Sequence, residues 1–156
     1  MISGTKSLNG GTRAWKSNFG FALLSLRKDF SNFWPLRMIT FADIEYAYQV
    51  VKPVVHKTPL LSSRTVNQIT GNEVRFKAEN LQRIGAFKIR GAYNKIASLS
   101  DDERKRGVVA HSSGNHAQGV ALASTLLGVK ATVVMPKGSP PNKIAATQAY
   151  GVQVIF

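Results

Sequence analysis

The sequence of 156 residues contains no cysteine, which excludes disulfides, thiolate-bound metals and a cysteine nucleophile. It also lacks a long hydrophobic run. The clearest apolar stretch, Phe19–Leu26, has eight residues, whereas a membrane-spanning helix needs roughly twenty. We therefore expect no membrane partner, and no pattern of metal ligands suggests a metal site.

Acidic residues are scarce: 8 Asp and Glu face 21 Lys and Arg, for a net charge of +13. Phosphate backbones select clustered basic residues, so nucleic-acid binding with a steep salt dependence is one alternative. The charges are spread, however, and the densest basic run, residues 104–106, directly follows three acids at 101–103. We expect no nucleic-acid partner, and the excess suits a basic pocket for an anionic cofactor and a carboxylate substrate.

The first candidate motif surrounds Lys88. Residues 73–77 alternate in polarity, which predicts a half-buried strand after a turn at Gly71 and Asn72. Apolar residues recur at helical spacing from position 89 to position 99. Lys88 thus lies where a loop becomes a helix, between two apolar neighbours. A partly desolvated amine there is a candidate Schiff-base nucleophile, although most lysines at helix starts are solvated and have no chemical role.

The second motif is residues 108–119, another strand that turns through glycine into a helix. Strands expected at 108–111, 131–135 and 152–156 alternate with helices at 115–127 and 140–150. Ser139 is the expected cap of the second helix and Pro140 its first residue. This alternation predicts right-handed βαβ units on a parallel sheet covered on both faces, an α/β fold.

The segment before these motifs contains fewer chemical signals. Thr40 is the expected cap of a helix that runs to Val51 and is stopped by Pro53. A short helix is expected at 64–69, and Ser100 begins a capping box for a helical turn that Gly107 ends. His56 is a lone histidine to which we assign no role.

Together the two motifs resemble those of the fold type II pyridoxal-phosphate enzymes, specifically the threonine/serine dehydratases (ammonia-lyases) and serine racemase. The resemblance covers Met38–Phe156 and implies the three-layer parallel-sheet α/β fold of the tryptophan synthase beta-like enzymes, truncated to its front part. It implies an extension at 1–37, disordered or presequence-like, the N-terminal part of the large domain at 38–106, and a partial small α/β domain at 107–156. A cytoplasmic homo-oligomer is expected for the full-length member, with an organellar presequence at 1–37 as the alternative.

The resemblance also implies roles for individual residues. Lys88, preceded by Phe87 in the cofactor site, would hold pyridoxal 5'-phosphate as a Schiff base and later take the substrate α-proton. Asn115 would hydrogen-bond the phenolic oxygen of the cofactor ring. Ser113 matches the serine that acts on the opposite substrate face in the racemase, and a hydroxyl that caps the following helix is the alternative. The turn that would receive the substrate carboxylate comprises Ser112, Ser113, Gly114, Asn115 and His116, of which His116 also suits a purely structural place in the helix.

Two departures from the family pattern bear on activity. Residues 84–86 read Ile-Gly-Ala where the family commonly has Thr-Gly-Ser, a version similar to that of 3-hydroxyaspartate dehydratases. The family's later glycine-rich phosphate loop, and its serine or cysteine at the pyridine nitrogen, have no counterpart here, because the only Gly-Gly is Gly10–Gly11. The predicted function is conversion of L-threonine or L-serine to a 2-oxo acid and ammonia by α,β-elimination. Serine racemase, 3-hydroxyaspartate dehydratase and a catalytically silent fragment are the alternatives.

Overall fold

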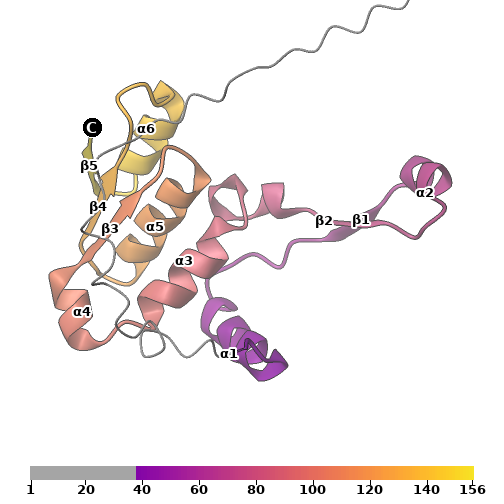
Figure 1. Cartoon of the computed structure of the whole chain (residues 1–156), viewed down its shortest axis with the longest axis horizontal. Helices are drawn as coiled ribbons and strands as arrows, with labels where there is room; N and C mark the ends of the chain where they lie inside the picture. The colour runs from indigo at the N-terminus through magenta and orange to yellow at the C-terminus, as the bar shows by residue number, and fades with distance from the viewer. Residues whose placement is uncertain (1–37) are drawn as a thin grey trace, which may run out of the picture. The chain divides into compact units, whose positions relative to one another are not determined.

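The computed structural model describes residues 38–156, so the expectations for residues 1–37 lie outside the described part. Residues 39–156 form one unit, whose elements are labelled in Figure 1. Its elements, in chain order, are α1 (Phe41–Val51), β1 (Leu60–Ser62), α2 (Arg64–Thr70), β2 (Arg75–Lys77), two 3₁₀ turns η2 (Glu79–Leu81) and η3 (Arg83–Gly85), α3 (Lys88–Ala97), α4 (Asp101–Arg106), β3 (Val108–His111), α5 (Asn115–Leu126), β4 (Ala131–Val134), α6 (Pro141–Gln148) and β5 (Gln153–Ile155).

The three later strands form a parallel sheet in the order β3-β4-β5, which confirms the predicted βαβ units. Helices α5 and α6 connect these strands, contact each other and lie on the same side of the sheet. Burial is therefore one-sided: Ala131 and Val133 are buried, while Thr132 and Val134, which alternate with them, are half-buried. The expected cover on both faces is not found within residues 38–156, and Val109 on β3 is 75% exposed.

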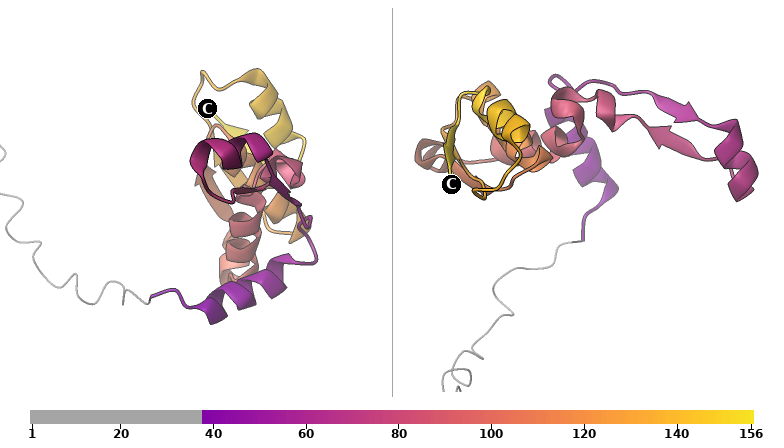
Figure 2. Two further views of the ribbon diagram at one scale, coloured as in Figure 1. Left: turned by 90° about the vertical axis from the view of Figure 1, so that its right-hand side faces the viewer. Right: turned by 90° about the horizontal axis from the view of Figure 1, so that it is seen from above.

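The first two strands form a separate antiparallel pair in which Leu60 faces Lys77 and Ser62 faces Arg75. Helix α2 joins their far ends (Figure 2) and ends at Gly71, whose φ of 66° suits glycine. The prediction of a half-buried strand at 73–77 is wrong in two respects. The strand begins at Arg75, and every residue of both strands is exposed, because no other element of the described chain covers either face of the pair.

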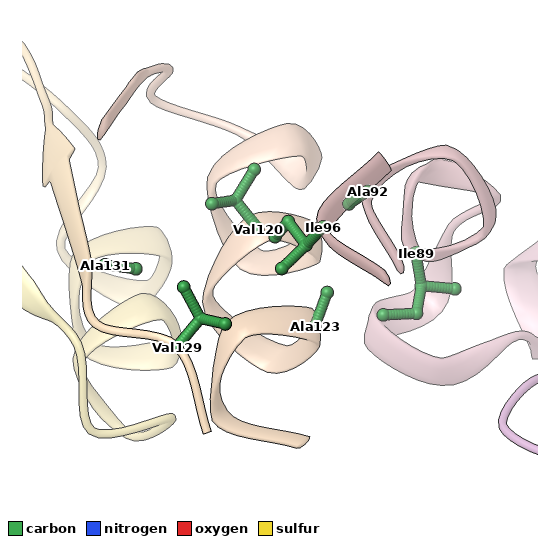
Figure 3. Close-up of a cluster of buried hydrophobic side chains, with 7 residues drawn as sticks. All are labelled: Ile89, Ala92, Ile96, Val120, Ala123, Val129 and Ala131. Atoms are coloured by element: carbon green, nitrogen blue, oxygen red, sulfur yellow. The ribbon is translucent and has the colours of Figure 1, made fainter. Parts of the chain in front are cut away.

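The main core lies between α3 and α5, the pair of helices with the most extensive mutual packing among those described (Figure 3). Ile96 of α3 lies beside Val120 and Ala123 of α5, and the cluster extends to the sheet. The buried members are Ile89, Ala92, Ile96, Val120, Ala123, Val129 and Ala131. The packing of α3 against α5 joins residues on both sides of the domain boundary expected between residues 106 and 107. The division into two domains remains a prediction.

Helix termini largely follow the expected capping. The capping boxes at Thr40 and Ser100 are both present. The prediction for α6 is wrong: the helix begins at Pro141 with Pro140 as its cap, and the hydroxyl of Ser139 donates to the carbonyl of Pro136 at 2.7 Å. The reason is steric, because a proline disfavours the helical conformation of the residue before it, and Pro140, which precedes Pro141, has a ψ of 132°. None of the helices within residues 38–156 has the length and apolar character that crossing a membrane requires.

Candidate active site

Lys88 is the first residue of α3, as predicted. Its side chain is exposed, and its Nζ lies 5.0 Å from the centroid of the neighbouring Phe87 ring. The expected desolvation is not found, because Phe87 is also 56% exposed and only Ile89 is buried in the core. The amine is therefore open to an aldehyde from solvent.

A tight turn precedes Lys88 in the chain. Ile84 has a φ of 62° and Gly85 a φ of 65°, so two successive residues adopt the left-handed conformation. Glycine accepts this conformation freely, whereas a β-branched residue is strained there. Ile84 is held because its side chain packs against the α3–α5 core.

A charged pair anchors this turn to α3. Glu79 accepts hydrogen bonds from Nε and Nη2 of Arg90 at 2.9 and 2.8 Å, and from the hydroxyl of Thr58 at 2.6 Å. The hydrogen bond from Arg90, helped by Thr58 and against the effect of burial, lowers the pKa of Glu79 to about 2. The same pairing raises the pKa of Arg90, which follows Lys88 by two residues.

A buried amide makes a second anchor. Gln82 accepts a hydrogen bond from the backbone N–H of His56 at 2.8 Å and donates one to the His56 carbonyl at 2.8 Å. The Nδ1 of His56 lies 3.2 Å from the carbonyl oxygen of Leu81, which only accepts, so Nδ1 carries the proton. His56 is thus a structural residue here. Sequence reasoning missed both Glu79 and Gln82, whose only signal was polarity in the loop before Lys88.

The second predicted motif forms the turn between β3 and α5. Gly114 is the cap of α5 and Asn115 its first residue. The hydroxyl of Ser112 accepts a hydrogen bond from the Gly114 N–H at 3.2 Å, while Ser113 is exposed. No side chain caps α5, so Ser113 does not act as its capping hydroxyl. The first-turn N–H groups of this helix therefore remain available to a carboxylate.

The remaining residues of the turn face different neighbours. Asn115 is exposed, and its Oδ1 accepts a hydrogen bond from the Nζ of Lys143, on α6, at 3.0 Å. His116 lines a mostly apolar pocket with Lys95 of α3 and Val109 of β3. Sequence reasoning missed Lys143, because its position in the third place of α6 carries no motif.

Close packing of two helices links the motifs. Gly119 lies one turn after Asn115 on α5, and a Cβ there would stand 3.1 Å from the carbonyl carbon of Lys88. Any other residue would require the neighbouring backbone to shift by a few tenths of an ångström. The Lys88 amine and the Ser112–Asn115 turn therefore belong to neighbouring helices in direct backbone contact.

These groups fit one end of the cofactor that the sequence motifs imply. An accessible amine suits the aldehyde of pyridoxal phosphate, and an amide donor at Asn115 suits the ring oxygen. Within residues 38–156, no two consecutive glycines form a phosphate loop. The same described residues contain no group of three or more His, Asp or Glu side chains that would hold a metal ion.

Residues 51–156 match the family model described as pyridoxal-phosphate dependent enzyme, and the chain belongs to this family, which uses pyridoxal phosphate as cofactor. Among its relatives, the Thermotoga maritima L-threonine ammonia-lyase is 58% identical over 119 residues, which are 76% of this chain and 30% of that protein. The Saccharomyces cerevisiae L-threo-3-hydroxyaspartate ammonia-lyase is 51% identical over 116 residues, 74% of this chain and 36% of that protein.

Solved structures show the same fold. The Dictyostelium discoideum serine racemase superposes with a TM-score of 0.71 at 46% identity, covering 74% of this chain and 38% of that one. The processed form of threonine deaminase isoform 2 from Solanum lycopersicum gives a TM-score of 0.63 at 38% identity, covering 72% of this chain and 33% of the other. The α/β class and the family resemblance are thereby confirmed. The chain spans about a third of the length of the curated relatives it matches.

Proposed function

We propose that the protein acts as a pyridoxal-phosphate-dependent ammonia-lyase on a hydroxy amino acid, L-threonine or L-serine, releasing a 2-oxo acid and ammonia. One observation carries the proposal. Lys88, whose amine is exposed, is the first residue of α3, and the backbone of α3 packs closely against α5, a helix whose N-terminus has no side-chain cap. Family membership and the ammonia-lyase relatives support this assignment.

The chain's own residues divide the work. When bound, the cofactor supplies an electron sink for negative charge at the substrate α-carbon. The Lys88 amine would hold the cofactor covalently through the cofactor's aldehyde and, once displaced by the substrate's amino group, would accept the α-proton. The N–H groups at the start of α5 hold the substrate carboxylate, and Asn115 donates to the cofactor ring oxygen. The exposed hydroxyl of Ser113 stands at the same turn.

A second candidate substrate is 3-hydroxyaspartate. Residues 84–86 carry no hydroxyl, and Ala86 is buried at 7% exposure in the position where the family commonly has serine. Relatives named L-threo-3-hydroxyaspartate ammonia-lyase are 51% and 46% identical to the chain. Racemisation of serine is the further alternative, supported by Ser113 and by the relatives named serine racemase.

Several properties of the whole protein are also proposals. We infer a cytoplasmic homo-oligomer with a small amino-acid substrate and with neither nucleic acid nor membrane as partner. Residues 38–106 would belong to the large domain and residues 107–156 to the small one. The family resemblance supports each of these.

Product formation tests the proposed activity. The chain is incubated with pyridoxal phosphate and threonine, serine or 3-hydroxyaspartate, and 2-oxo acid, ammonia and D-serine are measured. Lys88→Ala should abolish product, whereas Lys95→Ala, which removes another exposed lysine of the same helix, should leave turnover within about twofold. Equal turnover by Lys88→Ala and the unmodified chain would contradict the role of Lys88. No turnover by the unmodified chain would identify a catalytically silent fragment.

A further inference from the structure

The contact between Lys143 and Asn115 joins two helices at the turn that leads into α5. The Nζ of Lys143 donates to the Oδ1 of Asn115 at 3.0 Å. A lysine ammonium carries only donors, so it selects the oxygen of the carboxamide and never its nitrogen. The hydrogen bond therefore fixes the orientation of the Asn115 carboxamide, and it leaves the Nδ2 group as a free donor.

The backbone segments that carry Lys143 and Asn115 are each held by other contacts. Thr147, which is fully buried, donates its hydroxyl to the carbonyl of Lys143 at 2.9 Å. Ile144, the next residue along α6, packs in one apolar cluster with Ala117, two residues after Asn115. The backbones that carry Lys143 and Asn115 are thus held in a set relation, which reduces the entropy lost in making the hydrogen bond.

Orientation matters because the two ends of a carboxamide have opposite effects on an anionic oxygen. The NH₂ end donates to such an oxygen, whereas the carbonyl end repels it. A free asparagine side chain populates both orientations. Among residues 38–156, Nδ2 of Asn115 has no hydrogen-bond acceptor, so it is available for a ligand oxygen.

We propose that Lys143 is a positioning residue that holds the Asn115 amide with its NH₂ group presented to the ring oxygen of the cofactor. The inference rests on the proposed function, since it takes Asn115 as the residue that meets that oxygen. The adjacent positive charge of Lys143 also polarises the amide and strengthens Nδ2 as a donor.

The first test needs no cofactor. In ¹⁵N-labelled chain, the side-chain NH₂ signals of Asn115 are assigned by their loss in Asn115→Asp. Lys143→Met roughly keeps the length of the side chain but removes its hydrogen-bond donor. It should shift the Asn115 NH₂ signals and speed rotation of the Asn115 carboxamide group. Lys143→Arg should restore them in large part, and Lys130→Met, a matched loss of an exposed lysine in the connection between α5 and β4, should leave them unchanged. Asn115 signals that are identical in Lys143→Met and in the unmodified chain would overturn the inference.

The second test reads the cofactor. In a titration with pyridoxal phosphate, Lys143→Met should weaken formation of the imine absorbance band about five- to tenfold, the effect of losing roughly one ordinary hydrogen bond. Asn115→Asp keeps a partner for Lys143 but removes the donor, so it should fold normally and weaken the band at least as much. Equal titrations for Lys143→Met and Lys130→Met would overturn the inference. Absence of any specific imine band in the unmodified chain would instead count against the proposed function, and the NMR measurement of the Asn115 amide would then decide the role of Lys143.

Discussion

At the scale of single residues, Gly119 is the position on which the geometry of the site depends most closely. It sets how near α5 comes to the backbone of Lys88, with 3.1 to 3.3 Å between a hypothetical Cβ and the nearest backbone atoms of Lys88 and Ile89. Backbone atoms cannot swing aside as a flexible side chain does. A methyl group at this position therefore requires the backbone at Lys88 and Ile89 to shift by a few tenths of an ångström.

Gly119→Ala should lower the free energy of unfolding by about 1–3 kcal/mol, because overpacking forces backbone shifts. Gly91→Ala on α3 is the matched control: apart from its chain neighbours and the backbone of its own helix, no atom lies within 4 Å of its Cβ position, so alanine should stabilise the helix by about 0.5–1 kcal/mol. Urea unfolding followed by circular dichroism measures both. Equal effects of the two substitutions would contradict the close approach.

Glu79 carries the acid sensitivity of the loop before Lys88. Its pKa is lowered to about 2 in the fold from an ordinary value near 4.5, first by the hydrogen bond from Arg90. A lowered pKa in the folded state means that the carboxylate contributes its full stabilisation above pH 4.5. That contribution is lost progressively as the pH falls from about 4.5 to about 2.

Glu79→Gln should therefore destabilise the chain by about 1–3 kcal/mol at neutral pH and flatten the loss of stability below pH 4.5. Glu73→Gln removes the acid of an exposed ion pair with Arg75, whose side chains are 69% and 61% exposed, and should change stability by less than about 0.5 kcal/mol. Urea midpoints at several pH values between 2 and 7 give the comparison. If stability fell with decreasing pH in Glu79→Gln as it does in the unmodified chain, Glu79 would not be the source of the acid sensitivity.

At the scale of elements, the parallel sheet and the antiparallel pair differ in how they are supported. Strand β4 is central, with Val133 fully buried beneath α5 and α6, whereas β1 and β2 are exposed on both faces. An isolated two-stranded pair is marginal in water, because it buries too little apolar surface.

Hydrogen exchange should separate the two sheets. Backbone amides of β1 and β2 should exchange at least about a hundredfold faster than those of β4 and of Ala121 and Ala123 in α5, since local opening costs little where few apolar contacts are lost. The experiment is amide exchange read by NMR or by mass spectrometry of peptides. Comparable protection of β1–β2 and β4 would mean that the pair is covered in solution.

The same contrast explains what the sequence predicts well. Caps act through neighbouring residues, so the starts of α1 and α4 follow from Thr40 and Ser100. Apolar periodicity places helices and their inner faces, but it does not say whether another element covers them. On α1 only Val51 is buried, while Ile44, on the same predicted face, is 56% exposed.

For the candidate site, the sequence predicts the lysine at the start of α3 and the turn before α5, because each follows from a local pattern of strand, glycine and helix. It does not predict that Lys88 is exposed or that Lys143 meets Asn115, since both depend on packing between distant segments. The failure of Ser139 as a cap was, in contrast, predictable, because Pro141 disfavours the helical conformation at Pro140 before it.

At the scale of the whole molecule, the chain is a member of the pyridoxal-phosphate-dependent family that spans about a third of the length of its relatives. Lys88 begins one of two closely packed helices, and the turn at residues 112–115, to which the resemblance assigns the substrate carboxylate, leads into the other. The central claim is that this pairing makes one lysine, out of many on a strongly basic chain, the site of cofactor attachment.

Mapping the attached lysine tests that claim most directly. The chain is titrated with pyridoxal phosphate, the imine is reduced with borohydride, and the modified peptides are identified by mass spectrometry. We predict an imine absorbance band and labelling concentrated at Lys88, with both lost in Lys88→Ala and retained in Lys95→Ala. Labelling spread evenly over many lysines, with the same pattern in Lys88→Ala, would contradict the account.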